Sequence, residues 1–212
     1  LTPKERLLKT FRGEKADRVP IILHGFKFSN RDKVEGIADP AWREVAFRIY
    51  DKMHYQINVD SHVNRYFATP RQFIDESEDR DGEGNIITTR IINTPQGKLT
   101  CAVGRKPGLD TTWTIKYPVE TLEDINKIRS IKWELPRGLK PHAISDLSTG
   151  ARQRGVVYTM ISSPFVCVAG MMPYEYFLEL CATELELIKE LTAQCSERVE
   201  NILEVLLSGN TM

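Results

Sequence analysis

The chain has 212 residues, 41% of them hydrophobic, so it can bury one large core and is expected to form a single domain over residues 1–212. Its 29 basic residues equal its 29 acidic ones, which argues against a nucleic-acid partner or a charged membrane surface. No apolar run approaches the roughly 20 residues that span a bilayer, and four cysteines without CxxC spacing are typical of free thiols in a reducing cytoplasm.

The amino-terminal segment, residues 1–18, is predicted to contain a helix over 3–12. Thr2 is its expected cap and Gly13 its stop. Residues 19–24 are apolar without alternation, which predicts a parallel strand buried on both faces.

A loop of about fifteen residues follows, long for a connection between a strand and a helix. If the strand opens a barrel, His24 at its carboxyl end is a candidate acid or base. Phe26 and Phe28 in the same loop are candidate substrate contacts. Helical spacing then predicts a helix over 41–54, and residues 55–60 predict a second strand.

Turn signals divide residues 81–117 into short alternating runs, which predicts an antiparallel meander inserted into the main frame. A helix capped by Thr121 is expected after it. The remaining expected elements are helices at 141–153, 174–181 and 183–207 and a strand at 156–161.

These elements predict an α/β fold of the (β/α)8 TIM-barrel type, represented by an incomplete amino-terminal portion with a small antiparallel meander. Such a barrel closes with eight strands, and only three barrel strands are predicted here. The chain is therefore expected to be part of a larger enzyme, with exposed strand edges covered by a homodimer or by further polypeptide.

Several stretches together resemble the uroporphyrinogen decarboxylase superfamily, which includes corrinoid-dependent methyltransferases. They are TPKERLLKTFRG at 2–13, DRVP at 17–20, NTPQGKL at 93–99, YPVETLED at 117–124 and SPF at 163–165. The resemblance lies in their order and spacing across the chain. It implies a TIM barrel whose site lies at the carboxyl ends of the strands.

The two branches of this superfamily differ in the residues that they require. The decarboxylases carry an arginine pair after the first strand, an aspartate at the end of the second, and a tyrosine after the SPF segment. Asp60 matches the aspartate, but the arginine pair is missing and the tyrosine position falls near Gly170. The resemblance therefore implies first a corrinoid-linked, zinc-dependent methyltransferase, with the tetrapyrrole decarboxylase as the alternative.

Zinc sites need three or four converging ligands, and this sequence offers no such spacing. No metal ligand is assigned here, and zinc is expected only if a carboxyl-terminal half outside this sequence supplies its ligands. Cys181 and Cys195 would lie about 21 Å apart on a continuous helix, which is too far for a shared ion. Buried packing is the expected role of Cys167, Cys181 and Cys195.

The candidate catalytic residues are Asp60, His62 and His24. Asp60 and His62 are two positions apart at the end of the second strand, so the carboxylate could orient the imidazole. The alternative is that these residues only cap a loop. His24 could equally be a histidine bonded to backbone.

The candidate substrate-binding residues beyond Phe26 and Phe28 are Arg65, Tyr66 and Phe165. Arg65 and Tyr66 could hold an anionic ligand, although arginines in surface loops are often only solvated. The expected partner is a small molecule or a corrinoid protein. A third possibility, of a different class, is a non-catalytic binding or assembly module.

Overall fold

The computed structural model describes residues 1–23, 31–52, 54–109, 111–140 and 155–208. Its backbone contacts divide the chain into two compact units. Unit 1 holds residues 1–60 and 142–160, and unit 2 holds residues 61–141 and 161–208. No helix in the described part of the chain combines the length and apolar character needed to cross a lipid bilayer.

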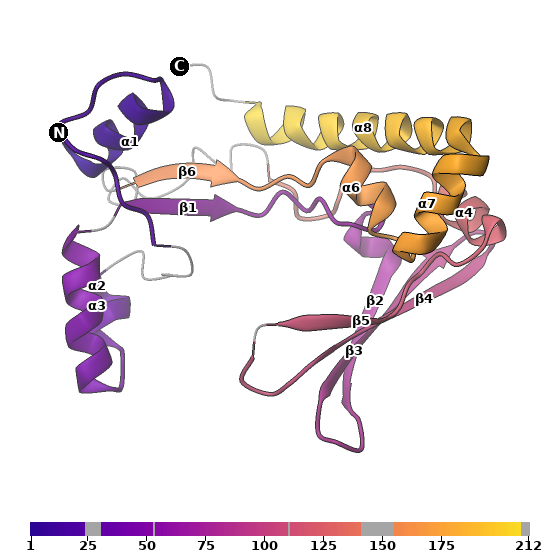
Figure 1. The fold of residues 1–212 in the computed structure, drawn as a ribbon, viewed down its shortest axis with the longest axis horizontal. Helices are drawn as coiled ribbons and strands as arrows, with labels where there is room; N and C mark the ends of the chain where they lie inside the picture. The colour runs from indigo at the N-terminus through magenta and orange to yellow at the C-terminus, as the bar shows by residue number, and fades with distance from the viewer. Residues whose placement is uncertain (24–30, 53, 110, 141–154, 209–212) are drawn as a thin grey trace. The chain divides into compact units, whose positions relative to one another are not determined.

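The described residues of unit 1 form three helices and one small parallel sheet (Figure 1). In the sheet, β1 pairs in parallel with β6, and Val59 lies opposite Thr159. The bounds are α1 Pro3–Phe11, α2 Arg31–Glu35, α3 Pro40–Lys52, β1 Tyr55–Val59 and β6 Gly155–Thr159.

The start of α1 is fixed by the predicted cap. The Thr2 hydroxyl accepts from the backbone N–H of Glu5 at 3.2 Å, and the Glu5 carboxylate accepts from the backbone N–H of Thr2 at 2.8 Å. This reciprocal pair satisfies two amides that no helical carbonyl can reach. The predicted helix over 3–12 is thereby confirmed.

A partly buried polar network joins α1 to the chain that precedes β1. The Arg6 guanidinium donates to both carboxylate oxygens of Asp17 and, at 2.8 Å, to Nε2 of His54. Because a guanidinium can only donate, Nε2 must accept, and Nδ1 of the neutral imidazole carries the proton. That proton points to the carbonyl of Ile21 at 3.2 Å.

The strand predicted over residues 19–24 is wrong for the described residues 19–23, which form no strand. Val19 is 81% exposed and Leu23 44%, so this apolar run is not buried on both faces. The backbone of Ile21 instead meets His54, whose backbone N–H donates to the Ile21 carbonyl at 3.0 Å. The Ile21 backbone is therefore hydrogen-bonded by His54 and not by a neighbouring strand.

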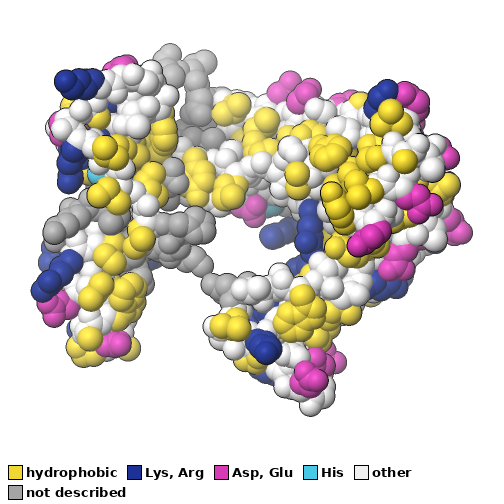
Figure 2. All heavy atoms as spheres, viewed as in Figure 1, with side chains coloured by type: hydrophobic (Ala, Val, Ile, Leu, Met, Phe, Trp, Pro, Cys, Tyr) yellow, Lys and Arg dark blue, Asp and Glu magenta, His cyan; other side chains and the backbone are white. Residues whose placement is uncertain are grey.

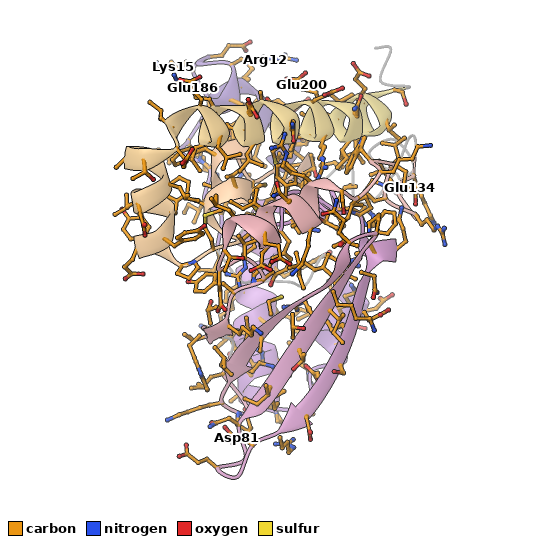
Figure 3. All side chains as sticks on the ribbon, turned by 90° about the vertical axis from the view of Figure 1, so that its right-hand side faces the viewer. Arg12, Lys15, Asp81, Glu134, Glu186 and Glu200 are labelled. Carbon is orange, nitrogen blue, oxygen red and sulfur yellow. The ribbon has the colours of Figure 1, made fainter. Side chains whose placement is uncertain are left out.

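Unit 2 contains a four-stranded antiparallel sheet in the order β2-β3-β4-β5, with helices packed over part of it. Figure 3 shows the β2-β3 hairpin reaching away from α8, with Asp81 at its tip. The bounds are η1 Arg71–Phe73, β2 Ile74–Arg80, β3 Ile86–Thr94, β4 Gly97–Arg105, β5 Thr112–Lys116, α4 Leu122–Arg129, α6 Pro164–Ala169, α7 Tyr174–Thr183 and α8 Leu185–Leu207.

The core of unit 2 forms where this sheet meets the helices. Ile92 of β3 lies opposite Leu99 of β4, and both are buried against Ile125 of α4. Spacing along α8 predicts an inward stripe, of which Ile188, Cys195 and Val199 belong to the same core. Ile202 and Leu206 of that stripe are also buried, whereas Leu185 is exposed. The meander predicted within residues 81–117 is present as β3, β4 and β5, whereas the acidic strand β2 was not predicted.

The predicted (β/α)8 barrel is wrong. The described residues place a four-stranded antiparallel sheet in one unit and a two-stranded parallel sheet in the other. Two of the three expected barrel strands, β1 and β6, do pair in parallel, but no described third strand joins them. The helix expected over 141–153 lies outside the described residues.

We predict that Gly104→Ala destabilises unit 2. The Trp113 indole lies across Gly104 from the paired strand, so an added methyl group would collide with it. Overpacking of this kind costs about 1–3 kcal/mol. Urea unfolding should show the loss, whereas Gly82→Ala, where a methyl group meets open space, should leave the midpoint unchanged. Equal midpoints for the two variants would contradict the packing described.

We also predict that acidification destabilises unit 1. Burial lowers the pKa of His54 below 6.5, and the charges of Arg6 and Arg18 act in the same direction, against the bond to the Ile21 backbone and the charge of Asp17. The unfolded chain therefore binds a proton first, and stability falls as the pH drops below about 6.5. Urea midpoints at several pH values should show this loss, and His54→Gln should reduce it. If the urea midpoint of His54→Gln falls with pH as steeply as that of the unchanged protein, other groups cause the loss.

Candidate functional site

The loop of residues 61–70, at the start of unit 2, carries concentrated backbone strain. His62, Phe67 and Ala68 have φ values of 60°, 58° and 50°, in the left-handed region that residues with a Cβ rarely adopt. Each such residue costs roughly 1–2 kcal/mol. Strain of this kind persists only where surrounding contacts hold it, and it clusters at binding sites. The 61–70 loop is therefore our candidate site.

Phe67 is held through both of its backbone polar groups. Its N–H donates to the carbonyl of Cys167 on α6 at 3.2 Å, and its carbonyl accepts from the Arg198 guanidinium on α8 at 2.9 Å. The same guanidinium lies 4.1 Å above the Phe67 ring and 5.3 Å from the Trp133 ring. Two helices thus fix one left-handed residue.

Asn64 closes the loop from within. Its side-chain carbonyl accepts from the backbone N–H of Tyr66 at 3.0 Å, and its side-chain amide donates to the carbonyl of Thr69 at 2.7 Å. The backbone N–H of Ala68 donates to the Asn64 carbonyl at 3.2 Å. These bonds satisfy the polar backbone groups of a buried turn.

A cluster of one aromatic and two cationic side chains lies at the centre of the site. Tyr66 is 6% exposed, and its hydroxyl accepts from Arg90 on β3 at 3.4 Å. Arg90 is anchored in turn by Glu76 on β2, with Nε 2.6 Å from a carboxylate oxygen. The exposed Arg65 places its guanidinium 5.5 Å from the centre of the Tyr66 ring. No carboxylate of the described residues forms an ion pair with Arg65.

Gly170, at the end of α6, allows this arrangement because it lacks a side chain. A Cβ there would lie 2.9 Å from Cβ of Arg65 and 2.9 Å from the carbonyl oxygen of Val166. Any larger residue would push the loop away. A tyrosine could not occupy this position without displacing Arg65.

The charges of the site follow from burial and partners. Burial raises the pKa of the Cys101 thiol, against a hydrogen bond from Tyr66 and the charges of Arg90 and Arg65. Burial also opposes the charge on Arg90, but Tyr66 and Glu76 outweigh it and raise the pKa of Arg90. The site keeps two positive charges near neutral pH, one of them already paired.

Three of the residues predicted from the sequence lie in the 61–70 loop: Arg65, Tyr66 and half-buried His62. Of these, the structure places Arg65 against the ring of Tyr66. Asp60 is exposed directly after β1 in unit 1, and the boundary between the units falls immediately after it. The orientation of His62 by Asp60 therefore stays a prediction.

The other predicted residues lie elsewhere. Phe165 is in the first turn of α6, half exposed, with its ring edge-on to Phe177 at 5.2 Å. It belongs to an apolar surface over α6 and α7, which Figure 2 shows in yellow. His24, Phe26 and Phe28 lie outside the described residues.

Sequence reasoning missed Arg90, Glu76, Cys101 and Arg198. Two of them carried a readable signal, because each is a charged residue at a position whose spacing predicts burial. Arg90 interrupts the inward alternation of β3, and Arg198 lies within the inward stripe of α8. A buried arginine needs a partner, which marks such positions as sites of specific contact.

A zinc ion finds no ligand set in the part of the chain that the structure describes. No group of three or more histidine, cysteine, aspartate or glutamate side chains converges there. All four cysteines are free, as the sequence predicted. These residues do not fit a zinc site.

Comparison with known proteins finds no matching family model, no matching curated protein and no matching solved structure. The superfamily resemblance therefore has no support beyond the residues that suggested it.

We predict that Arg198→Met loosens the 61–70 loop. The change leaves the buried carbonyl of Phe67 without its donor, at a cost of about 1–3 kcal/mol, and removes the stacking on two rings. Urea unfolding should detect the loss, and hydrogen exchange should quicken at the Phe67 amide. Lys189→Met, an exposed change on the same helix, is the control and should shift neither quantity. Matching results for both variants would show that Arg198 does not hold the turn.

Proposed function

We propose that this protein is a member of the uroporphyrinogen decarboxylase superfamily and acts in corrinoid-linked methyl transfer. The ordered segments at 2–13, 17–20, 93–99, 117–124 and 163–165 support the assignment. We propose a ligand and a class of reaction, and no barrel is proposed for these residues. Its cytoplasmic location and homodimeric state are part of the same proposal.

The observation that carries the proposal is the cluster made by Arg65, Tyr66 and Arg90. An exposed guanidinium supported by a buried aromatic ring, with a second guanidinium at the ring hydroxyl, suits a ligand with anionic substituents. A corrinoid is a large macrocycle, and cobalamin carries a phosphodiester that an exposed guanidinium can bind in a bidentate manner.

This chain's own residues would bind and orient the corrinoid. Arg65 would take the anion, because its donors are not engaged by a described carboxylate. Tyr66 is buried and its hydroxyl is held by Arg90, so its ring is a fixed support for the Arg65 guanidinium. We assign no step to zinc, since the described residues do not fit it.

Tetrapyrrole decarboxylation is the second candidate, favoured by one observation. Asp60 directly follows β1, is exposed, and matches the aspartate that the decarboxylases place after their second strand. A carboxylate there could stabilise a protonated pyrrole while a substrate carboxyl leaves as carbon dioxide. This reaction needs no cofactor.

We predict that the chain binds hydroxocobalamin and that Arg65→Met weakens this binding by about tenfold, which corresponds to about 1.4 kcal/mol. Absorbance titration measures the affinity. Lys132→Met, which removes an exposed positive charge elsewhere in unit 2, is the control and should leave the affinity unchanged.

Parallel titration with uroporphyrin separates the candidates. Preferential binding of uroporphyrin, with Asp60-dependent loss of acetate carboxyls from uroporphyrinogen, would replace methyl transfer by decarboxylation. Corrinoid binding without turnover on any methyl donor would favour a non-catalytic module. Binding of neither macrocycle would refute the proposal.

A further inference from the structure

Two cysteine thiols meet inside unit 2. Cys167 on α6 and Cys195 on α8 are both 0% exposed and lie in the same core cluster. α6 packs against α8, and the two thiols lie within hydrogen-bonding reach of each other, while the Cys167 thiol also donates to the carbonyl of Ser162 at 3.9 Å. Their contact arises only from the packing of these helices.

The same two helices hold the strained turn of the 61–70 loop. The carbonyl of Cys167 accepts from the N–H of Phe67, so the residue that carries one thiol also carries one anchor of the turn. Arg198, the other anchor, follows Cys195 by about one helical turn and lies on the same side of α8. Any covalent link between the thiols would therefore join the two helices that hold the backbone of Phe67.

We propose that Cys167 and Cys195 are a redox modification site, in which a disulfide fastens α6 to α8 and locks the 61–70 loop. The oxidant is a hydroperoxide, with hydrogen peroxide as the simplest case. This inference stands independently of the corrinoid proposal.

The reaction balances with one peroxide for each pair. The sulfur of Cys167 attacks the O–O bond, which breaks to give a sulfenic acid and one water molecule. The sulfur of Cys195 then attacks the sulfenic sulfur, so an S–S bond forms, the S–O bond breaks, and a second water leaves with the thiol proton. Two thiols lose two electrons, and the peroxide gains them.

The electrostatics of the pair favour this order. The hydrogen bond from Cys195 lowers the pKa of Cys167, against the effect of burial. The hydrogen bond to Cys167 and burial together raise the pKa of Cys195 far above the usual thiol range. Cys167 is therefore the thiol that ionises first, and the thiolate is the nucleophile. Because both thiols are buried, oxidation must follow a local opening of the helices.

The test uses the Cys181→Ser variant of the whole chain. Trypsin leaves Cys167 and Cys181 on one peptide, 155–189, and Cys195 on another, 190–198, so this change makes the assignment of a cross-link unique. After treatment with hydrogen peroxide and non-reducing digestion, we expect these two peptides to be joined within one chain. Dithiothreitol should separate them.

The second measurement reports on the loop. After oxidation, exchange of the Phe67 amide should slow by about tenfold or more, because the bridge restricts separation of α6 from α8. The variant that also carries Cys195→Ser is the control, and its exchange rate should not change. Absence of the intrachain cross-link would overturn the proposal, as would a cross-link that forms only in urea or one that leaves Phe67 exchange unaltered.

Discussion

The two bonds to the backbone of Phe67 are the constraint on which unit 2 depends. A phenylalanine with φ near 58° is unfavourable alone, so the turn exists because α6 supplies a carbonyl and α8 supplies a guanidinium. Arg198 is buried, which lowers its pKa to about 10, yet it remains charged at neutral pH. Its cost of burial is offset by the Phe67 carbonyl and by the faces of Phe67 and Trp133.

Fixing the backbone of Phe67 also fixes its neighbours, whose side chains are the candidate ligand contacts. Tyr66 precedes it, and the Tyr66 hydroxyl reaches Arg90 across the sheet. Glu76 on the edge strand takes part of the charge of Arg90, which leaves Arg65 as the cation open to an anionic ligand. The site is thus assembled from one loop and two strands, with the helices as its support. The thiol pair lies within that support.

In unit 1 the described polar contacts stabilise local structure and do not assemble a candidate site. The segments that suggested a family, around Thr2, Arg6 and Asp17, serve local structure in the described residues: a capping box and a buried guanidinium with two carboxylate bonds. Likewise Ser163 and Pro164 begin α6, where the serine hydroxyl accepts from the N–H of Val166. In this chain these motifs serve folding, so their presence does not mark ligand contacts.

The sequence by itself determined the elements whose signals are local. Caps and spacing placed α1, α3, α4, α7 and α8, and turn residues placed the meander, because each signal acts within a few residues. Only the tertiary structure decided which elements meet. β2 has no apolar alternation, and its position depends on its pairing with β3. The apolar run at 19–23 pairs with no strand, and its backbone is hydrogen-bonded by His54. The left-handed turn at Phe67 and the meeting of Cys167 with Cys195 depend on helices about a hundred residues or more beyond the loop, contacts that no local pattern encodes.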